Sequence, residues 1–320
     1  MAESAWPTPF TELVGCRLPL QMAVLGGGVG SVELAAAVSN AGGLGMLPQW
    51  APMPTEERVA WMRENTEAPF GMGFFAFDVE AQGELFDQVA RSVRVVDVFW
   101  GDPDARLVER IHRGGALAFW QVGSRDEALA AAAAGCDAVV AQGVEAGGHV
   151  RGTTPLLRLL EQVVPAVDLP VVAAGGISSG RAMAEAMRAG AAAVRVGTRL
   201  VATAEADAHP HYVDALLRAG AGSTVLCTAF GTGWPGAAHR VLQSCVDAGN
   251  ACTEETLGSG VAGDLSWSIP RWWMGPPLRS VSGRVDAMAL YAGEGVGDID
   301  DAPPAATVVE RMVEEARALL

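Results

Sequence analysis

Short apolar runs alternate with longer stretches of mixed apolar and polar residues along the first two thirds of the chain. The short runs are rich in β-branched and aromatic residues, and the longer stretches have the length and apolar spacing of amphipathic helices. This order predicts repeated strand–helix units around a parallel sheet. Eight strands are predicted, at residues 19–24, 44–46, 70–75, 95–99, 116–121, 138–142, 171–174 and 193–196.

Helix boundaries in the intervening segments agree with this pattern. A helix is predicted over residues 32–40, where Ser31 can cap the N-terminus and Gly42 can end the helix. Another is predicted over residues 125–134, with Gly135 as its stop. Eight strand–helix units predict an α/β fold, a closed (β/α)8 TIM barrel, whose chemistry lies in the loops at the carboxyl ends of the strands.

The rhythm breaks after about residue 220, where the chain becomes rich in glycine, proline and tryptophan. We therefore divide the chain into a barrel (1–220), an irregular lobe over the barrel mouth (221–305) and a C-terminal helix (306–320). The helix is predicted to pack back on the barrel through an apolar face formed by Val308, Val309, Met312 and Leu319.

Composition limits the partners. The net charge of −15 argues against binding nucleic acid or an anionic membrane, and no apolar run reaches the roughly 20 residues that span a bilayer. The N-terminus lacks the pattern of a signal peptide, and the five scattered cysteines fit neither a disulfide framework nor a zinc site, so we expect a soluble cytoplasmic protein. All 22 basic residues are arginine, which excludes a lysine Schiff base. The composition is compatible with a monomer and with a homodimer.

The most informative stretch, V-V-A-Q-G-V-E-A-G-G-H-V-R over residues 139–151, leaves the end of the sixth strand. Gly147 and Gly148 let a flat ligand approach the backbone, Gln142 offers an amide, and His149 offers a proton acceptor. A lone histidine is more often a structural hydrogen-bonding residue, so His149 needs support from the rest of the chain.

That support comes from two loops after the seventh and eighth strands. Gly175 and Gly176 follow one strand, and Gly197 and Thr198 follow the other. Either motif alone is more often a tight turn, but barrels commonly bind a phosphate between these two loops. We therefore predict a phosphate site there.

A further glycine-rich loop, residues 23–30, follows the first strand. No acidic residue stands where a dinucleotide-binding fold would hold ribose, so we expect Met22, Ala23 and Val24 to lie against an aromatic ring. A phosphate at one end, a flat ring at the other and a nearby histidine indicate flavin mononucleotide, FMN.

Other candidates have structural explanations. His209 and His211 flank a proline without a carboxylate or cysteine at ligand spacing, so no metal site is predicted. His239 and Glu145 can be structural or can serve the site, and Cys227 and Cys245 lack an activating cation. Four tryptophans of the lobe can line a substrate cavity or form a small core: Trp234, Trp267, Trp272 and Trp273.

At these residues the chain resembles the nitronate monooxygenases, formerly called 2-nitropropane dioxygenases, and related FMN-dependent barrel enzymes. The matching stretches are P-L-Q-M-A-V from residue 19, L-A-A-A-V-S-N-A-G-G-L-G from 34, A-Q-G-V-E-A-G-G-H from 141, A-A-G-G-I from 173, V-G-T-R-L-V-A-T-A-E from 196 and A-G-E-G-V-G-D-I from 292. The resemblance implies that His149 is the catalytic base, that Gln142 contacts flavin and that Gly176, Gly197 and Thr198 hold its phosphate.

Three positions depart from the family pattern. Gln21 and Gly73 stand where relatives usually have proline and asparagine, and Gln121 ends the fifth strand where many relatives place a lysine near the flavin. A neutral amide at Gln121 can contact flavin but contributes no positive charge.

Three functions remain open. The first is oxidation of alkyl nitronates or nitroalkanes with O2, with His149 as base. The second is an NAD(P)H-dependent enoyl-thioester reductase, in which His149 would donate a proton and a local arginine patch, for instance Arg271 and Arg279, would receive an anionic carrier. The third is flavin binding with little turnover. All three predict a small-molecule ligand and FMN.

Overall fold

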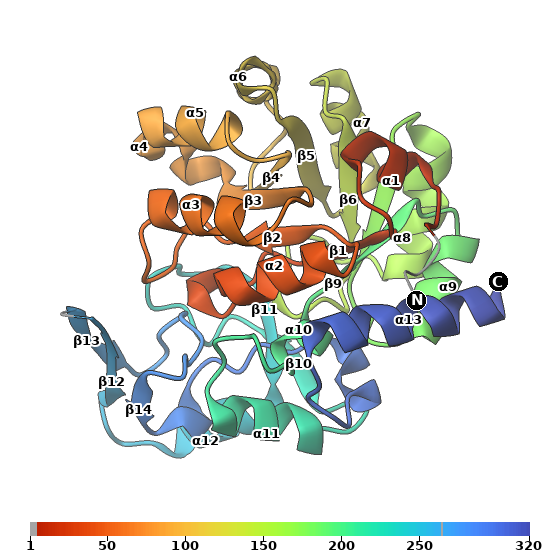
Figure 1. Cartoon of the computed structure of the whole chain (residues 1–320). Coiled ribbons are helices and arrows are strands. Elements are labelled where there is room, and N and C mark those ends of the chain that lie inside the picture. Colours follow the sequence, from red (N-terminus) through yellow and green to blue (C-terminus); the bar gives the residue numbers. More distant parts are fainter. Residues whose placement is uncertain (1–4, 264) are drawn as a thin grey trace.

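In the computed structural model, which describes residues 5–263 and 265–320, eight parallel strands form a nearly closed barrel (Figure 1). Their order around the barrel is β1-β9-β8-β6-β5-β4-β3-β2, and a parallel bridge between Gln21 and Leu44 joins the two edges. The predicted TIM-barrel-like α/β fold is therefore confirmed. The strands are β1 Leu20–Met22, β2 Gly45–Leu47, β3 Phe70–Phe75, β4 Val95–Phe99, β5 Leu117–Val122, β6 Ala138–Gln142, β8 Val171–Ala174 and β9 Ala193–Val196.

Helices form the layer outside the barrel. Their starts follow the predicted capping chemistry, since the Ser31 hydroxyl accepts from the backbone N–H of Leu34 and that of Ser124 accepts from Glu127. Gly42, with φ of +108°, follows the end of α2. The helices of the barrel region are α1 Pro9–Val14, α2 Val32–Asn40, α3 Thr55–Asn65, α4 Val79–Gln82, α5 Glu84–Ala90, α6 Ala105–Gly114, α7 Arg125–Ala133, α8 Leu156–Val163, α9 Gly180–Arg188, α10 Thr198–Val201 and α11 Pro210–Arg218.

The C-terminal helix α13, Ala305–Leu319, returns to the barrel and runs beside α9 and α2 (Figure 1). Val308, Val309 and Met312 are buried in that contact. Leu319 was predicted on the same face but is 43% exposed, although its backbone carbonyl accepts from Arg188 at the end of α9.

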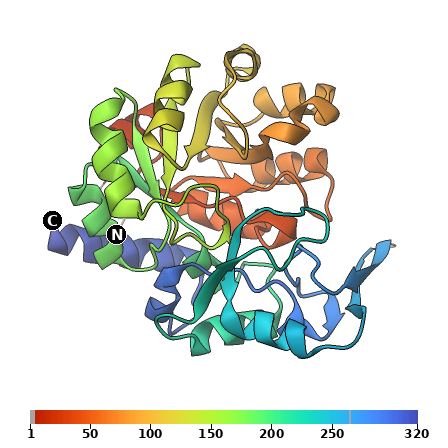
Figure 2. The same ribbon diagram turned by 180° about the vertical axis from the view of Figure 1, so that it is seen from behind.

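The region between the barrel and α13 contains more regular structure than its glycine and proline content predicts. It forms β10 Thr224–Cys227, β11 His239–Leu242, α12 Gln243–Ala251, β12 Thr256–Ala262, β13 Leu265–Pro270 and β14 Val281–Gly283. One antiparallel sheet has the order β13-β12-β14, and its β12–β13 hairpin projects from the body of the molecule (Figure 2). The strands were missed because Gly and Ser interrupt their alternation, as in T-L-G-S-G-V-A.

A second antiparallel sheet, β10-β11-β7, connects this region to the barrel. Its third strand, β7 Gly148–His149, belongs to the loop that follows barrel strand β6. The 3-10 helices are η1 Gly26–Gly28, η2 Ala76–Asp78, η3 Val164–Ala166, η4 Val285–Ala287 and η5 Glu294–Asp298. No helix in the described part of the chain is long and apolar enough to cross a membrane.

Candidate active site

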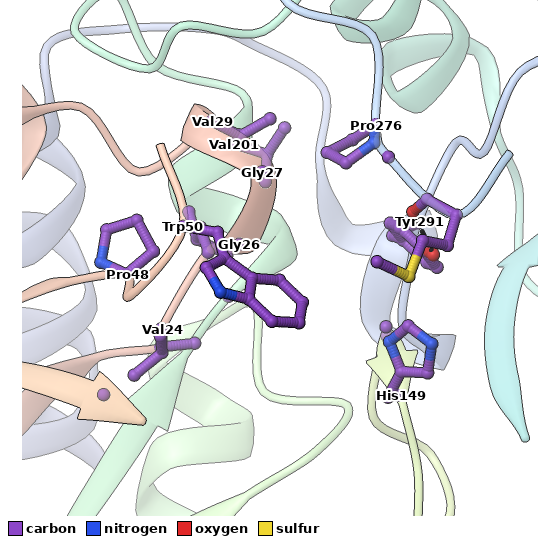
Figure 3. Close-up of a pocket in the computed structure, with 18 of the residues that line it drawn as sticks. Val24, Gly26, Gly27, Val29, Pro48, Trp50, His149, Val201, Pro276 and Tyr291 are labelled. Atoms are coloured by element: carbon purple, nitrogen blue, oxygen red, sulfur yellow. Dashed lines mark hydrogen bonds between the residues drawn. The ribbon is translucent and has the colours of Figure 1, made fainter. Parts of the chain in front are cut away.

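A cavity of about 600 Å³ opens where the carboxyl ends of the barrel strands meet the C-terminal region. Figure 3 shows the indole of Trp50 on one side of this cavity and His149 and Tyr291 on the opposite side. Eleven of the residues predicted for the site line it: Ala23, Val24, Gln121, Gln142, Gly147, Gly148, His149, Gly175, Gly176, Gly197 and Thr198.

Met22 is the exception, because the structure does not place it at the cavity. Side chains alternate along β1, so Gln21 enters the barrel and bonds with Arg195 while Met22 points to the other face. The Met22 side chain is fully buried in the hydrophobic core. The stretch that borders the cavity begins one residue later, at Ala23.

His149 is held by two connections of its backbone. Strand β7 pairs with β11, which sets His149 opposite His239 and Gly148 opposite Arg240. The side-chain amide of Gln142 donates to the His149 carbonyl at 3.1 Å. Gly147 is required here, since a Cβ would lie 2.5 Å from the backbone nitrogen of Gly293. The close approach at Gly147 is thus made by protein backbone, whereas a Cβ at Gly148 would meet nothing within 4 Å.

The imidazole of His149 is neutral at ordinary pH. Burial, and secondarily the neighbouring His239, lowers its pKa from 6.5 to about 3. Neither ring nitrogen has a hydrogen-bond partner among the described residues, and Nε2 is enclosed. Nδ1 is not among the enclosed atoms, so it is the nitrogen that a ligand in the cavity can reach. A neutral imidazole without a partner can accept a proton there.

Aromatic rings surround this histidine. Trp234, from the loop between β10 and β11, stacks on the imidazole with ring centroids 4.3 Å apart and planes at 27°. Trp100 meets the indole of Trp234 edge-on at 4.8 Å. Trp100 has φ of +61°, a left-handed conformation that is costly for a bulky residue and is found mainly at functional sites. Of the four tryptophans proposed for the cavity, Trp234, Trp267 and Trp273 line it, and Trp272 packs against Phe230 instead.

Two further residues have structural partners. The carboxylate of Glu145 accepts from the backbone N–H of Leu156 at 2.9 Å, which caps α8. His239 is fully buried, with Nε2 accepting from the backbone N–H of Phe230 and Nδ1 lying 2.8 Å from the Ala237 carbonyl. Both ring nitrogens of His239 are therefore occupied, unlike those of His149.

The two glycine loops of the predicted phosphate site lie side by side, since β8 and β9 are neighbouring strands. Gly175 and Gly176 have φ of +116° and +70°, which side chains rarely adopt. Thr198 begins α10, and its hydroxyl accepts from the backbone N–H of Gly293 at 3.0 Å. The Thr198 side chain thus ties the C-terminal region to the barrel as well as lining the cavity.

A buried ionic cluster lies at the barrel end of the cavity and was not anticipated. Arg195 of β9 pairs with Asp97 of β4, and their side chains are only 4% and 2% exposed. Arg195 also donates to the side-chain carbonyls of Gln121 at 2.7 Å and Gln21 at 3.3 Å. Burial raises the pKa of the Asp97 carboxyl, although the Arg195 guanidinium opposes that rise.

The sequence did contain a signal for this cluster. Asp97 and Arg195 each stand between valines in a buried strand, V-D-V and V-R-V, so both face the barrel interior. A charged residue at such a position needs a partner. No group of three or more His, Cys, Asp or Glu side chains placed to hold a metal ion occurs within residues 5–263 and 265–320.

Comparisons with known proteins agree with this architecture. The family model described as "Nitronate monooxygenase" matches residues 79–315. Among solved structures, the chain is similar to FabK from Thermotoga maritima, with a TM-score of 0.78, 27% identity and coverage of 98% of this chain and 97% of that one. It is also similar to a nitroalkane oxidase from Streptomyces ansochromogenes, with a TM-score of 0.74, 30% identity and coverage of 97% and 98%.

Two of the curated relatives differ in the activity that their names give. The chain is 30% identical to the "(3aS,4S,5R,7aS)-5-hydroxy-7a-methyl-1-oxo-octahydro-1H-indene-4-carboxyl-CoA dehydrogenase" of Mycobacterium tuberculosis, over 97% of this chain and 96% of the relative. It is 33% identical to the nitronate monooxygenase of Pseudomonas aeruginosa, over 68% and 75%. The family match covers well over half of the chain, and the chain belongs to the nitronate monooxygenase family of oxidoreductases.

Proposed function

We propose that the protein is an FMN-dependent oxidoreductase that oxidises nitroalkanes and alkyl nitronates with O2, and that His149 is its base. The observation that carries this proposal is the neutral, unpartnered imidazole of His149 on the cavity wall. A neutral imidazole has one ring nitrogen without a proton, and when no protein group occupies that nitrogen it can accept a proton from a substrate.

The cavity fits FMN. The left-handed glycine loop of Gly175 and Gly176 and the neighbouring Gly197 can present backbone N–H groups to a phosphate. Ala23 and Val24 offer an apolar surface for a flat ring, and the side-chain carbonyl of Gln142 is buried without a partner among the described residues. When bound, FMN accepts electrons from the substrate and passes them to O2.

The protein's own part in nitroalkane oxidation is removal of the α-proton. The C–H bond next to the nitro group breaks, its proton moves to Nδ1 of His149, and its electron pair enters the C–N bond of the nitronate. The proton converts the imidazole into a cation, for which the face of Trp234 provides a stabilising contact. A nitronate supplied as such has already lost this proton.

The second candidate is oxidation of a thioester, supported by the carboxyl-CoA dehydrogenase relative, which matches over nearly the whole chain. In that reaction too, His149 would act as the base, by removing a proton from the carbon next to the thioester carbonyl. Reduction of an enoyl thioester, the opposite direction, needs a protonated His149. The lowered pKa of His149 makes that form rare at neutral pH. Reduction would therefore start from a minor form of His149, and oxidation from the main one.

The test is anaerobic bleaching of the flavin in the purified protein by nitroethane, ethyl nitronate, an acyl-CoA, NADH or NADPH. We expect bleaching by nitroethane and by ethyl nitronate, followed by O2 uptake when air is admitted. In His149→Gln the rate with nitroethane should fall by roughly 10²–10⁴-fold, while the rate with ethyl nitronate should be largely retained.

Other outcomes separate the alternatives. Bleaching by the acyl-CoA alone would establish the dehydrogenase. Rapid bleaching by a nicotinamide would favour the reductase. A flavin that none of these compounds reduces would leave a binding protein with little turnover.

A further inference from the structure

The pair formed by Arg195 and Asp97 has no role in the proton transfer proposed for His149. Its two side chains come from strands on different sides of the barrel, 98 residues apart in the chain. Placing two charges inside a protein is costly, and a well-packed apolar pair is often at least as stable. Stability therefore does not explain why the barrel contains it.

The pair also supplies the two ionic side chains of the described cavity lining. Among the described residues that line the cavity, Arg195 is the only arginine and Asp97 is the only carboxylate. The guanidinium is fixed in place because it donates to acceptors from three strands: Asp97 on β4, Gln121 on β5 and Gln21 on β1. Because it is nearly inaccessible to water, its field is weakly screened.

Such a charge matters for a ligand that gains electrons. Taking up two electrons and one proton leaves the flat ring of FMN with one negative charge. In a cavity without other ionic side chains in its described lining, a fixed cation stabilises that charge and a carboxylate opposes it. The side chain of Gln121 cannot supply the cation, but it positions the one that does.

We propose that Arg195 is the residue that sets the reduction potential of bound FMN, and that Asp97 and Gln121 hold its guanidinium at the cavity. This inference rests on the FMN site of the proposed function. It assigns a positioning role to Gln121 and Asp97, and an electrostatic role to Arg195 that is independent of which substrate the enzyme oxidises.

The test is the midpoint potential of FMN, measured by dithionite titration against a reference dye at fixed pH. The variants are Arg195→Gln, Asp97→Asn, the double variant D97N/R195Q and the control Arg110→Gln. The control removes the guanidinium of a pair with Asp87 that lies on the outer helices α5 and α6. FMN affinity is measured in parallel by quenching of flavin fluorescence.

We expect Arg195→Gln to make two-electron reduction at least tenfold less favourable, a shift of about 30 mV to more negative potential. Asp97→Asn should shift the potential in the opposite direction, and Arg110→Gln should leave it unchanged. The double variant keeps two amides in the barrel and serves if Arg195→Gln does not fold. Its potential should lie below that of Asp97→Asn, because these two variants differ only in the arginine.

Two equalities would overturn the inference when the wild-type protein binds FMN: Arg195→Gln has the wild-type equilibrium for flavin reduction within threefold, or the double variant has that of Asp97→Asn within threefold. Wild-type protein that binds no FMN would overturn the proposed function together with this inference. If the wild-type protein does not turn over nitroalkanes but the variants show the expected order of potentials, only the proposed function is contradicted.

Discussion

The imidazole of His149 lies nearly parallel to the indole of Trp234, with ring centroids 4.3 Å apart. The contact covers one face of the proposed base with the electron-rich face of a large ring. An imidazolium is attracted to such a face, and a neutral imidazole less so. The stack therefore favours the protonated state that follows proton transfer, against the burial that disfavours it.

Replacing Trp234 with leucine should slow oxidation of nitroethane roughly tenfold, because the cation formed on His149 loses that contact. Trp234→Phe should lose less, since a smaller aromatic face remains. Rates with ethyl nitronate provide the internal control, because that substrate needs no base. Equal losses with both substrates would show that Trp234 only shapes the cavity.

His149 should make the fold sensitive to acid. Its pKa is about 3 in the folded protein and 6.5 as an unperturbed side chain, so the unfolded chain binds the proton first as pH falls. The stability that neutral His149 allows is fully present above pH 6.5 and is lost progressively between pH 6.5 and pH 3. Between pH 7 and pH 5, proton uptake by this histidine in the unfolded chain should lower the free energy of unfolding by roughly 2 kcal/mol.

The measurement is urea denaturation at both pH values for the wild type and His149→Gln. The variant cannot take up this proton, so its stability should fall by roughly 2 kcal/mol less over the same interval. Other titrating groups, including His239 with its lowered pKa, are common to both proteins. Identical pH dependences would mean that His149 is not held neutral by the fold.

Glu145 should act on the helix and not on the base. Its carboxylate accepts from the first backbone N–H of α8, so Glu145→Ala should lower the unfolding free energy by about 1 kcal/mol. Glu145→Gln keeps an acceptor and should lose less. The pH profile of nitroethane oxidation should stay in place in both variants. A displaced profile would show that Glu145 orients His149 after all.

Gly176→Ala should weaken FMN binding. Its φ of +70° is unfavourable for alanine by about 1 kcal/mol, and a Cβ would lie 3.2 Å from that of Glu145. Gly222 is a matched control, because its φ is +79° and a Cβ there would meet nothing within 4 Å. Both variants should lose similar stability, but only Gly176→Ala should raise the dissociation constant of FMN, as measured by flavin fluorescence.

The barrel could be predicted because the signal for each of its strands lies within a short stretch of sequence. Each is a short apolar run between helices with recognisable ends, such as Ser31 before α2, and repetition of the unit identifies the topology. The glycine loops followed, because in this fold they must lie at one end of the barrel. The two antiparallel sheets lacked such a pattern.

Contacts between distant segments could not be predicted in the same way. Asp97 and Arg195 meet across the barrel interior, and the sequence around each residue does not identify the other as its partner. Trp234 reaches His149 because of the path of a loop without a repeating pattern. Met22 shows a smaller error, since a shift of one residue along a strand turns a side chain to the opposite face.

The pairing of β7 with β11 bears on how new specificities can arise in this scaffold. The residue proposed to react is built into a sheet whose other two strands come from the region between the barrel and α13, which also lines the cavity. A change in the path of the loop between β10 and β11, which contributes Trp234 to the cavity, also bears on the backbone of His149. Exchange of this region between relatives should therefore carry reactivity and substrate preference together, as one inherited unit.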